Sequence, residues 1–453
     1  IKILLGSVSK NIFFDTPPTA QTVDKSTFIE GGVYMKKIVL GSFTLFVVYA
    51  VLIWLYLFQW SDTSIPDALK GTSVDPATFM NERELVLAQE YSQIKDFLFF
   101  LSVPYEWLGF VLVLVLGFSR KFSKWAKDIT KMSALQTAIY VFWLSLLLQV
   151  FTFPLDWISY KLSMAYNITT QSFTSWMKDM TIDFWISLIM MCLIVFVLYT
   201  LINKSPKRWW LYAWLLSIPF TLFITFIQPV VIDPLYNDFY PLKDKQLEEK
   251  ILHLADEASI PTDHVYEVNM SEKTNSMNAY VTGIGANSRI VLWDTTLNKL
   301  SDNEILFIMA HEMGHYVKKH IYVGIASALV LSLVGLWMTK KLSDMIMRKW
   351  GTNLKVKSFQ DVSSLPLILL LLSILTFAVS PATNLLSRHH EVQSDTYALE
   401  LTEDKEAAVK TFQALSRSGL SQVNPPFLVK VFRYSHPTIL ERIEFMEEHN
   451  KEE

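Results

Sequence analysis

Seven blocks of about twenty mostly apolar residues dominate the sequence and restrict what it can fold into. A helix needs roughly 20 such residues to cross the hydrocarbon core of a bilayer. Of the 453 residues, 51% are hydrophobic and 18% are charged, which is less charge than soluble domains normally carry. The sequence therefore predicts a mainly α-helical, multi-pass membrane protein with seven transmembrane helices. The predicted spans are residues 38–59, 97–118, 135–154, 183–202, 209–231, 321–339 and 365–386.

The second predicted span contains two residues that are unusual in a membrane, Pro104 and Glu106. An ionisable side chain at that depth usually faces a water-filled cavity or a partner. The alternative is that the span starts later in the chain and that Glu106 lies at the membrane surface. Both interpretations are compatible with the sequence.

The blocks divide the chain into five parts. Residues 1–34 precede the sequence Met35-Lys36-Lys37, which resembles a natural start, and are predicted to be an upstream extension or a disordered tail. Helices one to five occupy 35–232, and helices six and seven occupy 321–386. Between them, 233–320 predicts a small α/β unit, with a helix, a strand in "HVYEVNM", and two strands in "NAYVTGIGANSRIVLWD". Residues 387–453 predict a polar helical tail.

Charge and cysteine content exclude several classes of function. The net charge is −3, so no basic excess points to a nucleic-acid partner. The single cysteine, Cys192, lies in an apolar block and excludes an internal disulfide or a cysteine-rich metal site. Membrane lipids are the partners that the composition predicts, and in a prokaryote the membrane would be the plasma membrane.

The sequence "IMAHEMGHYVKKHI" at 308–321 carries a candidate metal centre. Ser301 and Glu304 form a capping-box pattern that starts a helix here, and the helix is expected to run on past His320 into the sixth span. His311 and His315 lie on one face of that helix and can both bind one zinc ion. Glu312, beside them, can take a proton from the attacking water. A helix with two surface histidines is the alternative.

A second segment, "SRHHEVQSDTYALE", supplies the third ligand that such a centre needs. Glu391 would complete a site of two histidines and one glutamate with an open position for water. Asp395, one helical turn later, could accept a hydrogen bond from a ligand imidazole and fix its orientation. The other histidines are interpreted as interfacial or surface residues: His253, His264, His320, His389, His390 and His449.

The combination of motifs resembles the type I CAAX prenyl endopeptidases and their bacterial relatives, with the heat-shock membrane protease HtpX as a more distant member. These are integral membrane zinc metalloproteases. The resemblance covers the chain from about Met35 onward. It rests on HEMGH, "SRHHEVQSD", "PLYNDFYPL" at 234–242, "NAYVTG" at 278–283, "RIVLWDT" at 289–295 and "YSHPTILERI" at 434–443.

The resemblance implies further site residues and a wider architecture. His436 would stabilise the oxyanion of the tetrahedral intermediate. Asn278, Ala279 and Tyr280 would form an edge strand along which a peptide substrate lies extended. Arg442 would pair with Glu391 or Asp395, or hold the tail. The seven helices would surround a chamber, with the metallopeptidase unit and its single zinc ion at the membrane edge.

Two indications conflict about which side of the membrane the site faces. The loops 119–134, 203–208 and 340–364 hold five, three and six lysines and arginines. The positive-inside rule places such loops in the cytoplasm and the peptidase unit on the other side. The family resemblance implies a cytosolic site.

The predicted function is hydrolysis of peptide bonds near the membrane by a zinc metalloendopeptidase. The substrate would be a peptide or a membrane protein, either a prenylated C-terminal motif or a damaged membrane protein. A site-2-type intramembrane protease is disfavoured, because no aspartate motif in a later span supplies the third ligand. The alternative from another class is a non-proteolytic transporter or scaffold with a structural zinc, and the intact Glu312 argues against it.

Overall fold

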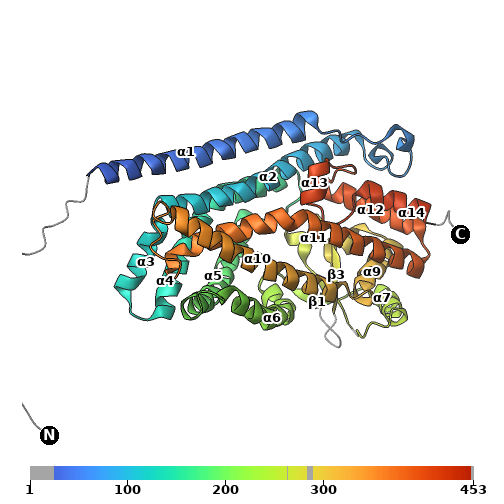
Figure 1. Ribbon diagram of the computed structural model, residues 1–453. Coiled ribbons are helices and arrows are strands. Elements are labelled where there is room, and N and C mark those ends of the chain that lie inside the picture. The colour runs from blue at the N-terminus through green and yellow to red at the C-terminus, as the bar shows by residue number, and fades with distance from the viewer. Residues whose placement is uncertain (1–24, 263, 283–288, 450–453) are drawn as a thin grey trace, which may run out of the picture.

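The computed structural model describes residues 25–262, 264–282 and 289–449 and is mostly helical (Figure 1). Long helices form a bundle at one end of the molecule, and a small sheet with shorter helices forms the other end. The helices are α1 (Lys25–Leu55), α2 (Glu82–Val115), α3 (Phe118–Ile129), α4 (Ser133–Ala165), α5 (Phe173–Lys204), α6 (Trp209–Ile227), α7 (Lys245–Glu257), α8 (Asp294–Lys299), α9 (Asp302–Val317), α10 (His320–Trp350), α11 (Leu365–Thr402), α12 (Lys405–Gly419), α13 (Phe427–Phe432) and α14 (Ile439–Glu448). The strands are β1 (Phe239–Pro241), β2 (Val265–Val268), β3 (Ala279–Thr282) and β4 (Arg289–Trp293).

The seven predicted spans are confirmed as six unbroken helices and one bent pair. Six helices in the described residues are long and apolar enough to cross a membrane. The fifth predicted span consists of Trp209–Thr225 and Gln228–Leu235, which meet at a bend of 43°. Pro229 explains the bend, because its ring lacks an N–H and clashes with the carbonyl four residues earlier in a continuous helix.

Two helices extend beyond their apolar spans. α2 begins at Glu82, where Asn81 and Glu84 form a capping box, well before the predicted start at residue 97. α11 continues without a break from the seventh span to Thr402, so the structure has no boundary at residue 387. One helix therefore belongs both to the membrane bundle and to the peptidase end, and it carries Glu391 and Asp395.

Glu106 has a partner inside the bundle. The Ser373 hydroxyl on α11 donates to Glu106 Oε2 at 3.3 Å, and Trp107 Nε1 donates to the same serine at 3.0 Å. The interpretation in which Glu106 meets a partner is the one that matches the structure. A polar cavity of about 520 Å³ lies between α4 and α5. The chamber bounded by all seven helices stays a prediction.

The four strands form one sheet in the order β1-β2-β4-β3. β1 pairs antiparallel with β2, β2 runs parallel to β4, and β3 pairs antiparallel with β4. β2, β3 and β4 were predicted from their apolar pattern, whereas β1 is only three residues long and ends in a proline. β3 is outermost, so among the described strands one of its edges has no partner. Ala279 and Tyr280 of the predicted edge strand lie on it, and Asn278 directly precedes it.

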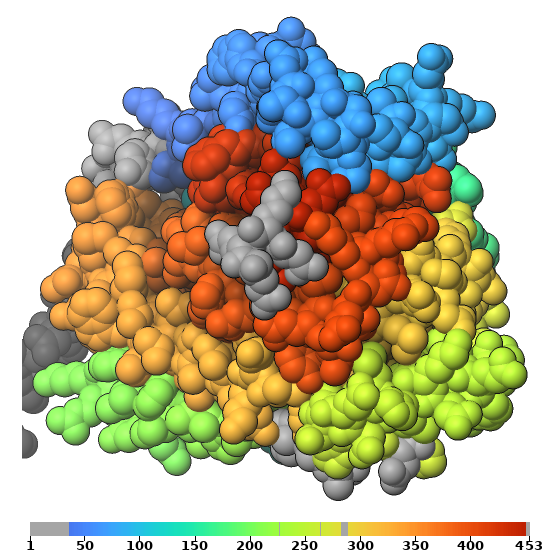
Figure 2. Space-filling view, turned by 90° about the vertical axis from the view of Figure 1, so that its right-hand side faces the viewer, coloured from blue at the N-terminus to red at the C-terminus, as the bar shows by residue number. Residues whose placement is uncertain are grey.

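A second apolar core, separate from the bundle, holds the sheet to α7, α9, α12 and α14. Its buried members include Ile251, Ile290, Phe307, Phe412 and Ile443. Figure 2 shows the outer face of this end, where the C-terminal helices (red) lie between the connection that follows α1 (blue) and α7 (yellow-green). This core fixes α9 against the sheet and against the C-terminal segment.

α1 begins at Lys25, within the segment 1–34 that was predicted to be an extension or a disordered tail. Residues 1–24, to which the same prediction applies, lie outside the described residues. α3, which contains much of the basic loop 119–134, lies at the opposite end of the bundle from α9 and the sheet (Figure 1). The loop 119–134 and the peptidase unit therefore lie at opposite ends of the fold, and the side of the membrane that each faces stays a prediction.

Close packing of α9 on α11 depends on Gly314. A Cβ atom at this position would lie 3.0 Å from Ser394 Cα and 3.3 Å from the Ser394 carbonyl oxygen. Backbone atoms cannot rotate away, so any larger residue must push the two helices apart. Because α11 carries Glu391, such a shift also moves that carboxylate relative to the histidines of α9.

Gly314→Ala should therefore destabilise the protein. The gain in helix propensity is about 0.5–1 kcal/mol, while overpacking costs about 1–3 kcal/mol. A net loss of roughly 1 kcal/mol follows, measurable as a lower Tm in detergent. Gly335→Ala on α10 is the matched control, because a Cβ atom added there would meet no neighbouring atom of the described residues within 4 Å. Equal Tm values for the two variants would contradict the explanation.

Candidate metal centre

α9 brings two imidazoles together on one face. The helix starts at the predicted capping box, in which the Ser301 N–H donates to Glu304 Oε2 at 2.8 Å. His311 and His315 are separated by one turn, and their Nε2 atoms lie 3.2 Å apart. His311 is buried, and His315 is partly exposed.

Glu391 on α11 faces both imidazoles from the neighbouring helix. Its Oε2 lies 3.2 Å from His311 Nε2, and its Oε1 lies 3.4 Å from His315 Nε2. One donor atom from each of the three residues lies within 4.8 Å of the other two. Residues that are 76 to 80 positions apart in sequence thus converge on one point.

The protonation of this group suits a divalent metal ion. His311 Nδ1 lies 2.8 Å from Asp395 Oδ1, and a carboxylate only accepts, so Nδ1 carries a hydrogen and the lone pair of the neutral ring is on Nε2. Glu391 Oε2 is buried and has no hydrogen-bond partner among the described residues. A buried acceptor without a donor costs about 1–3 kcal/mol unless a cation satisfies it. Two imidazole nitrogens and a carboxylate are a donor set that binds transition metals such as zinc.

Arg442 holds the carboxylate that orients His311. Its Nε donates to Asp395 Oδ2 at 2.8 Å, and a second guanidinium nitrogen donates to Oδ1. The guanidinium also lies 4.2 Å from the centre of the Phe412 ring. Of the partners expected for Arg442, Asp395 is the one that it contacts closely, and Glu391 is 3.9 Å away.

Burial and nearby carboxylates set the charge states on α9. Burial alone would lower the pKa of His311, but the Asp395 and Glu391 carboxylates outweigh it and raise the pKa to about 9, so a metal ion bound at Nε2 would replace a proton there. Burial raises the pKa of Glu312 above its usual range, against the opposing effect of the two imidazoles. A carboxylate with a raised pKa is a stronger base than an exposed one.

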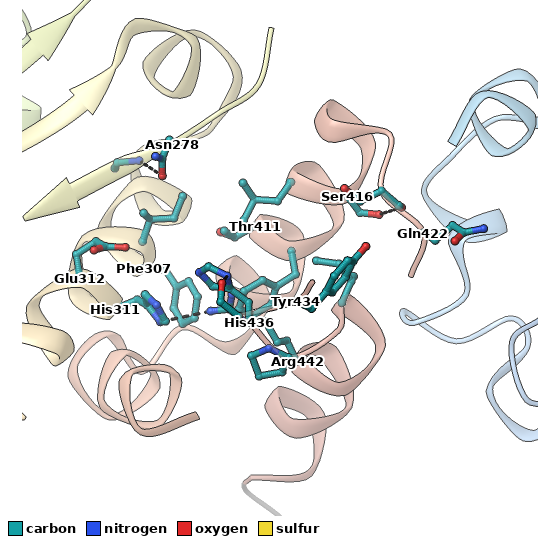
Figure 3. Close-up of a pocket in the computed structure, with 18 of the residues that line it drawn as sticks. Asn278, Phe307, His311, Glu312, Thr411, Ser416, Gln422, Tyr434, His436 and Arg442 are labelled. Carbon is teal, nitrogen blue, oxygen red and sulfur yellow. Dashed lines mark hydrogen bonds between the residues drawn. The ribbon is translucent and has the colours of Figure 1, made fainter. Parts of the chain in front are cut away.

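His311, one of the three candidate ligands, and Glu312 line a cavity of about 440 Å³. In Figure 3, Asn278 and Glu312 lie towards one side of it and Tyr434 towards the other, with His436 between them. His436 Nε2 lies 3.5 Å from Glu391 Oε1, and its side chain is exposed to the cavity. The C-terminal segment therefore brings His436 to the cavity that His311 lines, as the family resemblance implied, and its role as a hydrogen-bond donor stays a prediction.

The three residues of the predicted substrate strand do not share one environment. Asn278 is exposed at the cavity, and its Oδ1 accepts from the Ala279 N–H at 3.0 Å. Ala279 is buried in the core. The side chain of Tyr280 faces away, into a separate small cavity lined by Asp233 and Tyr266. Since side chains alternate along a strand, only the backbone of Tyr280 remains available at the β3 edge.

Two expectations about the segment after HEMGH are wrong. α9 does not continue into the sixth span, because it ends at Val317 and Lys319 adopts a left-handed conformation with φ of 59°. His320, interpreted as interfacial, is buried and lies 3.0 Å from His315. Neither glycine nor proline marks the break, so the local sequence carried no signal for it.

Comparison with known proteins agrees with this geometry. A model of peptidase family M48 matches residues 241–450, and a model described as "CAAX prenyl protease N-terminal, five membrane helices" matches residues 57–238. The "uncharacterized metalloprotease YhfN" of Bacillus subtilis is 56% identical over 413 residues, which cover 91% of this chain and 97% of that protein. This chain belongs to peptidase family M48.

More distant relatives include a CAAX prenyl protease and a protein of known structure. CAAX prenyl protease 1 of Saccharomyces cerevisiae is 28% identical over 68% of this chain and 71% of its own length. The crystal structure of S. mikatae Ste24p superposes with a TM-score of 0.76 at 25% identity, over 91% of this chain and 98% of that one. This M48 peptidase is thus an integral multi-pass membrane metalloprotease, and the transporter or scaffold alternative is not favoured.

Proposed function

We propose that this M48 peptidase is a zinc-dependent endopeptidase that cleaves extended peptides at the membrane surface. The observation that carries the proposal is the convergence of His311, His315 and Glu391 beside Glu312, at the wall of a cavity that β3 also borders. His311, His315 and Glu391 would hold one zinc ion. The unsatisfied Glu391 oxygen supports this set, as does the contact of His311 Nδ1 with Asp395, which leaves Nε2 for the metal.

Each neighbouring residue has a distinct task in the proposed reaction. A zinc ion in such a site supplies Lewis acidity, which polarises a carbonyl and makes water more acidic. Glu312 takes the proton of the attacking water and passes it to the leaving amine. His436 donates a hydrogen bond to the carbonyl oxygen as it becomes negatively charged. Asp395 and Arg442 keep the His311 ring in its orientation.

The free edge of β3 would bind the substrate backbone. An extended peptide adds to such an edge through main-chain hydrogen bonds. Asn278 and Ala279 line the cavity together with His311 and Glu312, so a peptide on this edge passes the candidate metal centre. Because main-chain contacts are the same for every sequence, this mode of binding requires no lipid on the substrate.

A pair of peptides tests the proposed activity. Both carry the same sequence with a C-terminal CAAX motif, and only one is farnesylated on its cysteine. The purified protein in detergent should cleave both, because recognition resides in the backbone. Mass spectrometry of the products gives the position and rate of cleavage, and Glu312→Gln serves as the matched inactive protein.

Each other outcome revises a specific part of the proposal. Cleavage of the farnesylated peptide alone would make the lipid part of recognition and would favour CAAX processing over clearance of damaged membrane proteins. If protein that holds its metal cleaves neither peptide, the proposed binding of extended substrates along β3 is contradicted.

A further inference from the structure

The histidine that follows the break between α9 and α10 lies directly behind one candidate ligand. His320 Nδ1 is 3.0 Å from His315 Nδ1, and His320 Nε2 is 2.9 Å from Gln393 Oε1. His320 is 7% exposed, and its ring stacks on that of His390 with 4.2 Å between ring centres. This group lies on the side of His315 that faces away from His311.

The hydrogen-bond partners determine which nitrogen of each ring carries the hydrogen. The amide oxygen of Gln393 only accepts, so His320 Nε2 must donate to it. In the neutral ring, His320 Nδ1 is then an acceptor, and His315 Nδ1 must donate to it. The remaining nitrogen, His315 Nε2, keeps a lone pair and points at His311 Nε2 and Glu391.

We infer that His320 and Gln393 are positioning residues that hold His315 in its metal-binding tautomer. They do for His315 what Asp395 and Arg442 do for His311. In the other tautomer, Nε2 would carry a hydrogen directed at the metal position and could not coordinate. α11 contributes one residue to each of the two arrangements: Gln393 for His315 and Asp395 for His311, on either side of Ser394. This inference rests on the proposed metal site.

The backbone break makes this contact possible. In a continuous helix, residues five apart are separated by about 140° around the axis and do not face each other. Lys319, with φ of 59° and ψ of 33°, redirects the chain so that the first residue of α10 turns back to His315. A left-handed conformation is strained for lysine and persists only where the surrounding structure requires it. The contact between His315 and His320 is such a requirement.

Variants at residue 320 separate the hydrogen bond from the packing of the ring. His320→Phe keeps a ring that can stack on His390 but removes the acceptor. His320→Asn loses the ring, but its carboxamide oxygen stands where Nδ1 stands in histidine. Loss of an outer-sphere partner typically weakens metal binding roughly 10–100-fold. We expect that loss for His320→Phe and its substantial recovery in His320→Asn, measured by competition with a zinc chelator at constant pH.

Gln393 provides an independent test on another helix. Gln393→Leu removes the acceptor for His320 and should weaken zinc binding in the same direction, whereas Gln393→Glu retains an acceptor and should not. His390→Phe is the control, because it keeps the stacked ring. Melting temperatures of the metal-free proteins measure any loss of packing or hydrogen bonding separately from the loss of zinc affinity.

The outcomes distinguish the inference from the proposed function. If the unaltered protein binds no zinc, the proposed metal centre fails. If it binds zinc and both His320→Phe and Gln393→Leu retain its affinity, the positioning role is refuted while the metal centre stands. If His320→Asn loses as much zinc affinity as His320→Phe, the positioning role is also refuted, because the acceptor atom would then make no difference.

Discussion

Replacing Glu312 by glutamine should reduce peptide hydrolysis by about 100- to 10,000-fold, the usual contribution of a general acid–base residue. Glutamine has nearly the same shape but cannot accept a proton at neutral pH. The residue lines the cavity beside His311, and burial raises the pKa of its carboxyl group. The measurement is the initial rate of peptide cleavage by protein of known zinc content.

The zinc content should remain that of the unaltered protein, because Glu312 is not part of the group formed by His311, His315 and Glu391. Glu249→Gln, an exposed glutamate on α7, is the control for the chemical change. Unchanged turnover in Glu312→Gln with zinc still bound would show that another residue is the base.

Glu391→Ala should abolish zinc binding and activity together. The substitution removes one of three donors, and the loss should exceed the roughly 10–100-fold seen for outer-sphere partners. Elemental analysis of the unaltered protein should give one zinc per chain, and the variant should hold a small fraction of that. Zinc added in excess should fail to restore the rate to the unaltered level.

Glu400→Ala, an exposed position on the same helix, controls for a change in α11 that has no effect at the site. Full zinc content in Glu391→Ala would contradict the ligand set. If the unaltered protein binds one ion of another metal per chain, the three proposed ligands stand and only the identity of the metal changes.

The features that could be predicted from sequence are those set by local pattern. Apolar length located the spans, and the spacing of His311 and His315 located the centre. The polar first part of α2 was not predicted, because apolar length identifies only the membrane-spanning part of a helix. The outward side chain of Tyr280 could have been predicted, since neighbouring residues in a strand point to opposite faces.

The features that could not be predicted depend on tertiary structure. The break at Lys319 lies at a residue type that carries no turn preference, and it follows from what surrounds it. The place of His320 depends on that break and on Gln393, which lies 73 positions later in the chain. The close approach of Gly314 to Ser394 likewise arises only when α9 and α11 pack together.

Because α11 runs unbroken from its membrane span to the metal centre, a change in the tilt of the span would also move Glu391. Membrane helices adjust their tilt to the thickness of the surrounding lipid. Pro381 lies within α11, near the end of the span that precedes Glu391, and about 15 Å ahead of that carboxylate at 1.5 Å per residue. A rotation of about 5° there displaces Glu391 by roughly 1 Å, while metal–ligand distances hold to about 0.2 Å. The close contact between Gly314 and Ser394 opposes such a displacement of α11 relative to α9.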